Sequence, residues 1–238
     1  LELAKLDFRL LQSLHQNELR NLSLWWKELG LIQSLNFARD RIVECYFWIL
    51  GVHYEPHLSH VRRMMTKVII LTSVLDDIYD SYGTLEELEL LTGVIHRWDI
   101  DSIEELPKYM KVYFVALTNT YKEFEDELAG EGKSYHVEYL KEEFEQKRDH
   151  VASSVQCYMK EHHVSKESAC QRFQEMINDA WKVMNQECLK PTTIPLQLLM
   201  STFNLSCIME TYYKYGDGYT ESSGATKDLI SLLLVECI

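Results

Sequence analysis

Apolar residues recur along this chain at the spacing of α-helices. Near the N-terminus, Leu10, Leu14, Leu22 and Leu29 fall on helical faces, which predicts a helix over residues 3–29. The same periodicity predicts further helices over residues 37–50, 61–81, 108–128, 135–159, 166–189, 196–213 and 227–235. No stretch of useful length alternates between apolar and polar residues as a β-strand would. The pattern therefore predicts an all-α class, a bundle of roughly ten helices.

Helix-breaking residues are rare in this chain, and two segments have the pattern of an N-terminal helix cap. Only 4 prolines and 9 glycines occur in the chain, which favours long helices over short strands and turns. Thr84 with Glu87, and Ser102 with Glu105, have the spacing of capping boxes. We therefore expect one helix to begin after Thr84 and another after Ser102.

The chain is acidic, and this narrows the classes of partner. Its 24 lysines and arginines stand against 37 aspartates and glutamates, which gives a formal net charge of −13. A surface of that sign repels phosphate backbones, so we expect no nucleic-acid partner. An anionic substrate would then need local attraction from metal ions or from a few placed arginines.

Cysteine usage and the lengths of the apolar runs indicate the compartment. The six cysteines form no Cys-x-x-Cys pair, and most have apolar neighbours, as expected for reduced, buried thiols. The chain shows no charged leader before an apolar run, although a true N-terminus can precede Leu1. No apolar stretch is long enough to span a bilayer. We therefore expect a cytoplasmic protein with no membrane partner.

Three carboxylates follow a segment that is apolar on almost every side. Residues 68–75 predict a buried helix, and Asp76, Asp77 and Asp80 come directly after it. Spacings of three and four residues place these side chains on one side of the helix end. Like charges repel there and the helix dipole disfavours anions, so a positive group has to offset the cost. Because clustered carboxylate oxygens suit a hard cation such as Mg²⁺, we favour a metal site over a solvated acidic turn.

Two arginines open the second predicted helix. Arg39 and Arg41 flank Asp40 at its start. Guanidinium groups beside a helix N-terminus can bind anionic oxygens together with the free backbone N–H groups. Taken alone, two arginines at a helix start are more often surface residues. The pair becomes informative only in combination with the other motifs.

Seven stretches together resemble one enzyme family. They read FARDRIVECYFW at 37–48, GVHYEP at 51–56, DDIYD at 76–80, YGTLEE at 82–87, RWDI at 97–100, LPKYM at 106–110 and GDGYT at 216–220. In this order they resemble the C-terminal catalytic domain of plant class I terpene synthases of the sesquiterpene type. The resemblance extends over nearly the whole chain. It implies a helical bundle like that of class I terpenoid synthases, built around a central apolar pocket.

The resemblance also implies a reaction. The chain is similar to magnesium-dependent sesquiterpene synthases, lyases that ionise farnesyl diphosphate and cyclise the carbocation with loss of diphosphate. Mg²⁺ is the implied cofactor, with Mn²⁺ as a substitute, and the implied protein is a monomer. Two other interpretations stay open. One is a catalytically impaired or non-catalytic helical relative that binds prenyl diphosphate, and the other is a prenyl-chain-elongating transferase.

Functional positions of the family fall on residues of this chain. The resemblance implies that Asp76, Asp77 and Asp80 bind magnesium and that Arg39 and Arg41 take up the departing diphosphate during catalysis. The other positions that match substrate-binding residues are Trp48, Ile69, Ser73, Tyr212, Asp217 and Tyr219. Aromatic rings suit a dry pocket because their faces attract a carbocation. We expect the aspartates at the mouth of the largest apolar pocket, with Trp48 and Tyr212 in its wall.

One part of the family pattern is interrupted. Glu145 matches the final glutamate of a second magnesium motif, but the acidic pair and hydroxyl residue that should precede it are absent. Residues 134–142 resemble an earlier region of the pattern instead. We therefore expect a missing segment, and a break in the polypeptide, between Leu140 and Glu143. On this interpretation residues 1–238 form a single catalytic α-domain that lacks this segment and the N-terminal domain of the family.

Overall fold

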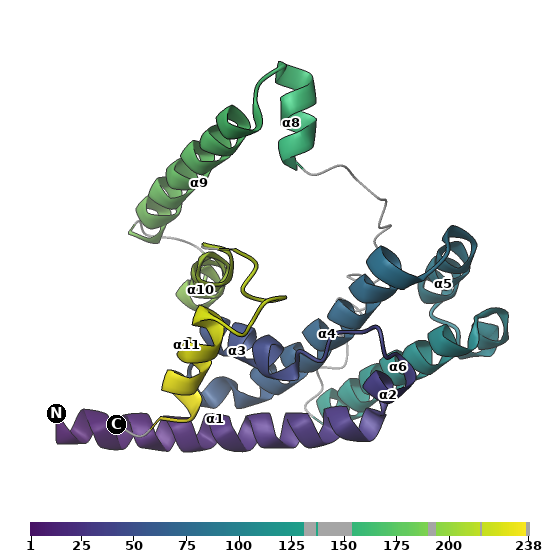
Figure 1. Ribbon diagram of the computed structural model, residues 1–238. Coiled ribbons are helices and arrows are strands. Elements are labelled where there is room, and N and C mark those ends of the chain that lie inside the picture. Colours follow the sequence, from purple (N-terminus) through teal and green to yellow (C-terminus); the bar gives the residue numbers. More distant parts are fainter. Residues whose placement is uncertain (131–136, 138–153, 190–193, 215, 237–238) are drawn as a thin grey trace. The chain divides into compact units, whose positions relative to one another are not determined.

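The computed structural model describes residues 1–130, 137, 154–189, 194–214 and 216–236. The chain divides into two compact units, one of Leu1–Gln146 with Cys207–Ile238 and one of Lys147–Ser206. The predicted all-α class is confirmed, because the described ranges form helices and turns and contain no strand (Figure 1). None of the helices in these ranges combines the length and the apolar character that crossing a bilayer requires.

The first unit holds most of the helices. Its α-helices are α1 (Glu2–Leu29), α2 (Leu31–Ser34), α3 (Ile42–Val52), α4 (Ser59–Asp77), α5 (Leu85–Arg97), α6 (Lys108–Ala129) and α11 (Ala225–Leu234). Two 3₁₀ segments, Pro56–Leu58 and Ile100–Glu105, and a π-helical turn, Ile78–Tyr82, connect them. Helix α1 contacts α3, α4 and α11 (Figure 1). Helix α10 (Leu196–Tyr213) begins in the second unit and ends in the first.

The second unit contains α8 (Ser154–His162), α9 (Lys166–Cys188) and the start of α10. Tyr158 of α8 packs edge-on against Phe173 of α9, with ring centroids 5.5 Å apart. Ile177 and Val183 on α9 remain 49% and 57% exposed. Among the described residues of this unit only Ala169 is fully buried. The described part of the unit therefore has almost no apolar core.

The core of the first unit is centred on α4. Ile70, Leu71, Val74 and Leu75 are buried there, as the apolar run before the aspartates predicts. Tyr113 of α6 donates its hydroxyl to the main-chain oxygen of Leu71 at 3.1 Å. Burial of a large aliphatic side chain contributes about 1.5–3 kcal/mol to stability. Helix α4 is thus a rigid base for the residues at its C-terminal end.

A buried ion pair ties α1 to α4. Arg62 has no exposed surface and donates through Nε and Nη2 to the two carboxylate oxygens of Glu18, at 2.9 and 2.7 Å. Tyr46 of α3 donates its hydroxyl to the same carboxylate at 2.8 Å. Arg62 Nη1 donates to the main-chain oxygens of His53 and Glu55. This Glu18–Arg62 cluster holds three helices together, and no motif in the sequence indicates it.

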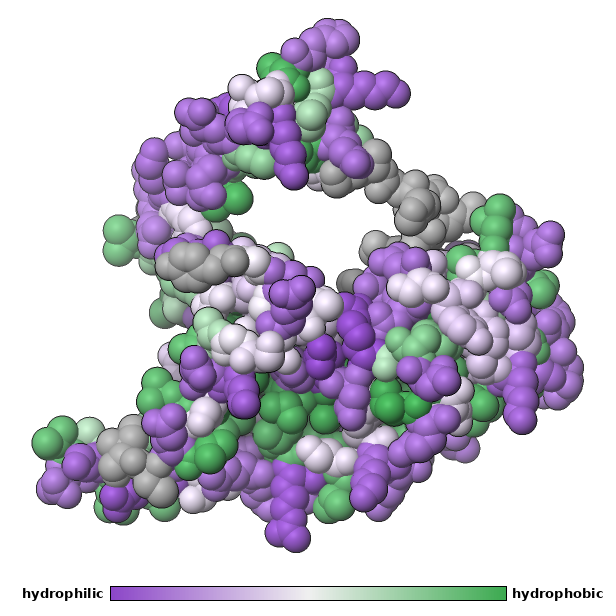
Figure 2. Space-filling model, in the orientation of Figure 1, coloured by the Kyte–Doolittle hydropathy of each residue, from purple (hydrophilic) through white to green (hydrophobic). Residues whose placement is uncertain are grey.

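The N-terminal part of α1 extends beyond the core. Leu3, Leu6 and Leu10 are 79%, 56% and 64% exposed, and Figure 2 shows hydrophobic and hydrophilic side chains mixed at this end. Further along, Gln12 donates to the main-chain oxygens of Leu233 and Glu236 at the end of α11. The predicted first helix is therefore confirmed, but its first turns add little to the core.

The two predicted capping boxes have different outcomes. The box of Thr84 and Glu87 is confirmed at the start of α5. The box predicted for Ser102 and Glu105 is wrong, because these residues lie in a 3₁₀ segment. Asp99 accepts hydrogen bonds from a main-chain N–H two residues on and from the Ser102 hydroxyl. The aspartate thus caps this segment in place of the serine.

The helix predicted to start at Phe37 begins later, at Ile42. The ring of Phe37 stacks on Tyr82, with centroids 3.9 Å apart. The main-chain N–H of Arg39 donates to the carboxylate of Asp77 at 2.8 Å. These tertiary contacts compete with helical pairing in the segment. Both of its arginines therefore precede α3 rather than open it.

Candidate active site

The three predicted metal ligands lie at the end of α4 and in the π-helical turn after it. Asp77 is buried, Asp76 is half-buried and Asp80 is exposed. The prediction that the three aspartate side chains share one side assumed a regular α-helix. The chain instead forms a π-helical turn over Ile78–Tyr82. Within the described ranges, no three carboxylate, imidazole or thiol groups gather closely enough to hold a metal ion. The structure therefore does not show the predicted convergence of all three aspartates.

Asp77 is directed toward Arg39 instead. Its Oδ2 accepts the main-chain N–H of Arg39 at 2.8 Å, and its Oδ1 accepts the Nε–H at 2.7 Å. Arg39 also meets Asp76 through Nη2 at 3.4 Å. Burial disfavours the charged guanidinium, but Asp77, Tyr219 and Asp76 together outweigh burial and raise the pKa of Arg39. A charged arginine is thus held at the end of α4 by two aspartates.

A third contact of Arg39 reaches the loop between α10 and α11. Its Nη1 donates to the hydroxyl of Thr220 at 2.9 Å. In the same loop, Asp217 accepts hydrogen bonds from the main-chain N–H groups of Tyr219 and Thr220 at 3.1 and 2.9 Å. Burial opposes the ionisation of Asp217, but these hydrogen bonds and the charge of Arg39 outweigh it and lower the pKa of Asp217. The loop therefore presents an ionised carboxylate beside Arg39.

A glycine allows this loop to pack closely. The N–H of Gly218 donates to the main-chain oxygen of Tyr212 at 2.9 Å. A Cβ at Gly218 would lie 2.6 Å from Oγ1 of Thr226 and 2.8 Å from the same Tyr212 oxygen. A side chain there would force the loop away from the ends of α10 and α11. The absence of a side chain thus brings the next two residues, Tyr219 and Thr220, to the arginines.

Aromatic rings gather between α3 and this loop. Trp48 stacks on Tyr212 with ring centroids 5.1 Å apart, and it meets Tyr219 edge-on at 5.7 Å. The guanidinium carbon of Arg39 lies 5.7 Å from the centroid of the Tyr219 ring. The Tyr212 hydroxyl donates to the main-chain oxygen of Glu44 at 2.8 Å. The rings are therefore fixed both by each other and by the backbone of α3.

These elements line a cavity of about 410 Å³, which we call the Arg39 cavity. Its lining residues are Arg39, Trp48, Ile69, Thr72, Ser73, Asp76, Tyr213, Asp217, Tyr219 and Thr220. The structure thus brings together six of the predicted substrate-binding residues. Tyr213 lines the cavity in the place predicted for Tyr212, which stacks on Trp48. Of the three aspartates, Asp76 alone is part of the lining.

The hydroxyl of Tyr219 is held from two sides. It donates to Oγ of Ser73 at 2.9 Å, and Sγ of Cys45 lies 3.2 Å away. Because a phenol has one proton, the Cys45 thiol is the donor in the second contact. Burial raises the pKa of Cys45 to about 12, so this thiol keeps its proton. Sequence reasoning missed Cys45, whose only signal is its place one helical turn before Trp48.

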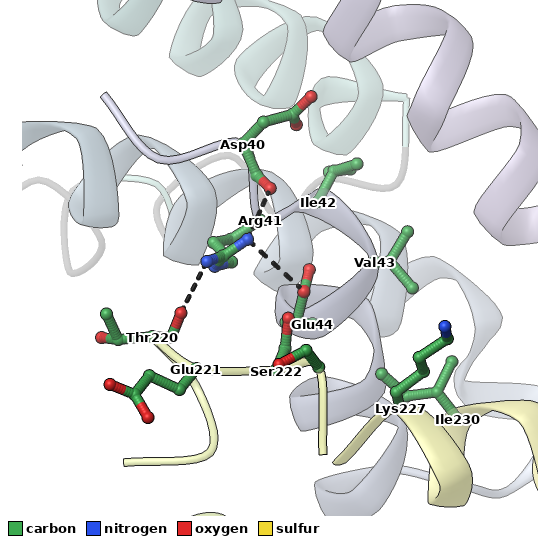
Figure 3. A pocket seen from close by; sticks show the side chains of 11 residues that line it. Asp40, Arg41, Ile42, Val43, Glu44, Thr220, Glu221, Ser222, Lys227 and Ile230 are labelled. Atoms are coloured by element: carbon green, nitrogen blue, oxygen red, sulfur yellow. Dashed lines mark hydrogen bonds and ion pairs between the residues drawn. The ribbon is translucent and has the colours of Figure 1, made fainter. Parts of the chain in front are cut away.

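Arg41 lines a second and larger hollow. Its Nη2 donates to the main-chain oxygen of Thr220 at 2.6 Å, and its Nη1 lies 3.8 Å from the carboxylate of Glu44 (Figure 3). This hollow, about 740 Å³, is lined by residues 40–44, 220–223, 227 and 230. The two arginines predicted to bind diphosphate together therefore line different cavities. The Arg39 cavity, where Asp76 lies, is the smaller of these two hollows.

Two of the site predictions fall on residues outside the described ranges, as does most of the helix predicted over residues 135–159. Glu145, the predicted ligand from the second metal motif, is one of them. The window from Leu140 to Glu143, where we expect a break in the polypeptide, is the other. Both stay predictions.

The carboxylates of Asp76 and Asp80 are the candidates to hold a divalent cation. Both are accessible to solvent, and Asp76 lines the Arg39 cavity. A magnesium ion usually keeps several waters and needs only one or two protein carboxylates besides the substrate phosphates. The donor set therefore fits Mg²⁺. Asp77 accepts hydrogen bonds from Arg39 on both of its oxygens in this arrangement, and its role as a metal ligand stays a prediction.

The chain matches known proteins along most of its length. Residues 27–146 and 141–183 match the model of the terpene synthase family, metal binding domain. The chain is 39% identical to (-)-germacrene D synthase of Vitis vinifera over 319 positions, and 39% identical to valencene synthase of the same plant over 321. These alignments cover 99% and 100% of this chain, but 57% and 58% of the two relatives. The chain thus spans a little over half the length of the curated relatives it matches.

A solved structure has the same fold. It is isoprene synthase from grey poplar leaves in complex with three Mg²⁺ ions and dimethylallyl-S-thiolodiphosphate. The TM-score is 0.85 at 28% identity, and the match covers 100% of this chain and 61% of that one. The expected helical architecture of class I terpenoid synthases is thereby confirmed. Together with the family match and the 39% identity along almost the whole chain, this shows that the chain belongs to the terpene synthase family.

Proposed function

We propose that this chain is the catalytic domain, or most of it, of a sesquiterpene synthase that acts on farnesyl diphosphate. The observation that carries the proposal is 39% identity to germacrene D and valencene synthases along almost the whole chain. The Arg39 cavity supports it, because a cationic side chain and aromatic rings line one space of about 410 Å³. A space of this size suits a small apolar ligand with a polar end.

The polar end of the substrate is the diphosphate. Arg39 binds it at the cavity and stabilises the negative charge that develops as the carbon–oxygen bond breaks. Asp77 keeps the guanidinium in place through two hydrogen bonds of 2.8 and 2.7 Å. Mg²⁺, or Mn²⁺ in its place, would be held by Asp76 and Asp80 and would act as a Lewis acid on the leaving diphosphate.

The rest of the cavity receives the prenyl chain. Trp48 and Tyr219 present aromatic rings to it, and a cation near such a ring gains about 0.5–2 kcal/mol. Ile69 adds an apolar wall, which helps to exclude water. The phenol proton of Tyr219 is directed at Ser73, so this ring stays in one orientation while the carbocation cyclises. Deprotonation or capture by water ends the reaction.

A second candidate function is diphosphate binding without turnover. An alignment of 319 positions is longer than the 238 residues of this chain, so the relatives contain residues that it lacks. The family model matches in two stretches that meet at residues 141–146. This supports our proposal of a missing segment between Leu140 and Glu143, and with it the loss of most of the metal motif that ends at Glu145. Such a loss would impair ionisation.

Incubation of the chain with farnesyl diphosphate and Mg²⁺ tests the proposal. We expect volatile sesquiterpenes, detected by gas chromatography with mass spectrometry. Asp76→Asn should reduce their amount strongly, whereas the matched control Asp179→Asn, an exposed aspartate on α9, should not. Absence of products together with Mg²⁺-dependent binding of inorganic diphosphate would favour the second candidate. Longer prenyl diphosphates formed with added isopentenyl diphosphate would favour a chain-elongating transferase.

We also propose that the protein acts as a monomer in the cytoplasm, without a nucleic-acid or membrane partner. Its formal net charge of −13 supports the exclusion of nucleic acid. The absence of Cys-x-x-Cys pairs from the sequence is in line with a reducing compartment.

A further inference from the structure

We propose that Thr220 is a positioning residue that holds Arg39 over its cavity until a diphosphate replaces it. The inference rests on the proposed function and deepens it. The motif GDGYT at 216–220 contains this threonine, but the resemblance assigns it no role. Two observations carry it: both arginines bind Thr220, and Thr220 lines both cavities.

The two arginines use different groups of this one residue. Arg39 donates from Nη1 to the hydroxyl oxygen of Thr220 at 2.9 Å. Arg41 donates from Nη2 to its main-chain oxygen at 2.6 Å (Figure 3). The side chain can therefore be changed while the contact of Arg41 with the backbone is kept. This separates the role of the hydroxyl from the attachment of the loop.

The hydroxyl completes the set of acceptors around Arg39. The guanidinium is a rigid, planar fork. Its Nε meets Asp77, its Nη2 meets Asp76, and its Nη1 meets Thr220. Acceptors on all three nitrogens fix the plane of the group, whereas the two aspartates alone would leave the Nη1 end unsupported. Thr220 therefore sets which edge of Arg39 faces the cavity.

Thr220 is also the acceptor that is easiest to displace. It is neutral, so its hydrogen bond with the guanidinium lacks the attraction between opposite charges that a carboxylate or a phosphate adds. An entering diphosphate oxygen therefore competes with Thr220 more readily than with Asp76 or Asp77. The main-chain N–H of Thr220 donates to Asp217 at 2.9 Å, which keeps this residue in place after Arg39 leaves. Arg39 is thus oriented in advance without being blocked.

Two substitutions isolate the hydroxyl. Thr220→Val keeps the branched shape and the main-chain oxygen, and Thr220→Ser keeps the hydroxyl. We expect Thr220→Val to weaken the binding of inorganic diphosphate with Mg²⁺, measured by calorimetry, and to raise KM for farnesyl diphosphate, each by about tenfold. The value of kcat should change less. Thr220→Ser should stay within about twofold of the original protein, because its oxygen can still accept from Arg39.

A double-variant cycle with Arg39→Ala distinguishes positioning from a structural role. If Thr220 acts through Arg39, Thr220→Val should add no further loss to the Arg39→Ala variant. A loss of the same size in both backgrounds would overturn the inference, and so would unchanged diphosphate affinity in Thr220→Val. In either case the proposed function would stand, provided that the unsubstituted chain binds diphosphate and forms products. If the unsubstituted chain does neither, the proposed function and this inference fail together.

Discussion

Arg62 and Arg39 each bind a carboxylate from another part of the chain, in opposite surroundings. Arg62 is fully buried, and its partner Glu18 is 3% exposed. The side chain of Arg39 is 26% exposed, while its partners Asp77 and Asp76 are 8% and 44% exposed. Arg62 has two carboxylate contacts and two main-chain contacts. Arg39 depends in part on a neutral hydroxyl from a loop.

The difference separates an arginine that holds helices together from one that can accept a ligand. The acceptors around Arg62 are fixed by α1 and by the backbone before α4, so an anion has no access and no acceptor to replace. Arg39 lines a cavity and has one acceptor of low strength. Removing a hydrogen-bond acceptor of Arg62 should therefore lower the stability of the fold. Removing a hydrogen-bond acceptor of Arg39 should instead weaken ligand binding.

The largest expected effect is loss of stability in Arg62→Met. This change leaves the Glu18 carboxylate buried and unpaired, which costs about 3–5 kcal/mol. Thermal unfolding followed by circular dichroism should show a clear fall in Tm. The neighbour Arg63, whose side chain is 43% exposed, gives the matched control, because Arg63→Met should cost no more than about 1 kcal/mol. Equal Tm values for the two variants would contradict the structural role of the buried pair.

A smaller effect, on activity rather than stability, is expected from Asp77→Asn. The change removes the charged partner of Arg39, and hydrogen bonds to charged groups contribute about 1.5–3 kcal/mol. We therefore expect kcat/KM for farnesyl diphosphate to fall about ten- to hundredfold, with an unchanged helical circular dichroism spectrum. The exposed Asp126 provides the control variant Asp126→Asn.

The Mg²⁺ requirement of Asp77→Asn tests how Asp77 acts. If Asp77 works through Arg39, the Mg²⁺ concentration for half-maximal diphosphate binding should stay close to that of the unsubstituted chain. Asp76→Asn should raise that concentration, because Asp76 is a candidate ligand. A similar rise in Asp77→Asn would instead make Asp77 a metal ligand, as first predicted from the sequence.

The smallest effect concerns the pH dependence of the Glu18–Arg62 cluster. Burial lowers the pKa of the neighbouring His15 below 6.5, and the charge of Arg62 lowers it further. As the pH falls below 6.5, His15 therefore takes up a proton in the unfolded chain before it does so in the folded chain. The free energy of unfolding decreases as a result. Burial and the charge of Arg62 also lower the pKa of His53, so His53 contributes to the pH dependence of stability in the same direction as His15.

Glu18 itself should contribute only in more acidic solution. Burial raises the pKa of Glu18, but hydrogen bonds from Arg62, Ser59 and Tyr46 together with the charge of Arg62 outweigh it and lower this pKa from 4.5. The contribution of Glu18 is therefore lost as the pH falls below that value. Tm measured between about pH 7.5 and pH 5.5 should therefore decline less in His15→Gln than in the unsubstituted chain. The exposed His96 gives the control His96→Gln. Parallel declines in all three proteins would exclude His15 as the cause.

Local patterns predicted the helices where neighbours in sequence decide the structure. The apolar run before Asp76 and the capping box at Thr84 depend on residues within a few positions, and both were predicted correctly. The start of α3 was wrong because Asp77, far along the chain, accepts the N–H of Arg39. The Glu18–Arg62 pair was missed for the same reason, since no periodicity connects residues this far apart.

The candidate site shows the same limit. The resemblance placed Trp48 and Tyr219 at one cavity, because the family motif carries over position by position. It could not show that Arg39 and Arg41 line different cavities, since that depends on which atoms of Thr220 each arginine reaches. Side-chain directions of this kind arise from the packing of the loop after α10. They are therefore visible only in three dimensions.

The contact between Cys45 and Tyr219 gives the cavity a chemical marker. Among the described cysteines, Cys45 is buried and retains its proton up to about pH 12, whereas Cys157, Cys170 and Cys207 are exposed. Thiol reagents attack the deprotonated, accessible form. Alkylation should therefore proceed at the exposed cysteines first and reach Cys45 only after an opening that exposes its thiol. Protection of the Cys45 thiol from alkylation therefore indicates that the packing around Cys45 and Tyr219 is intact.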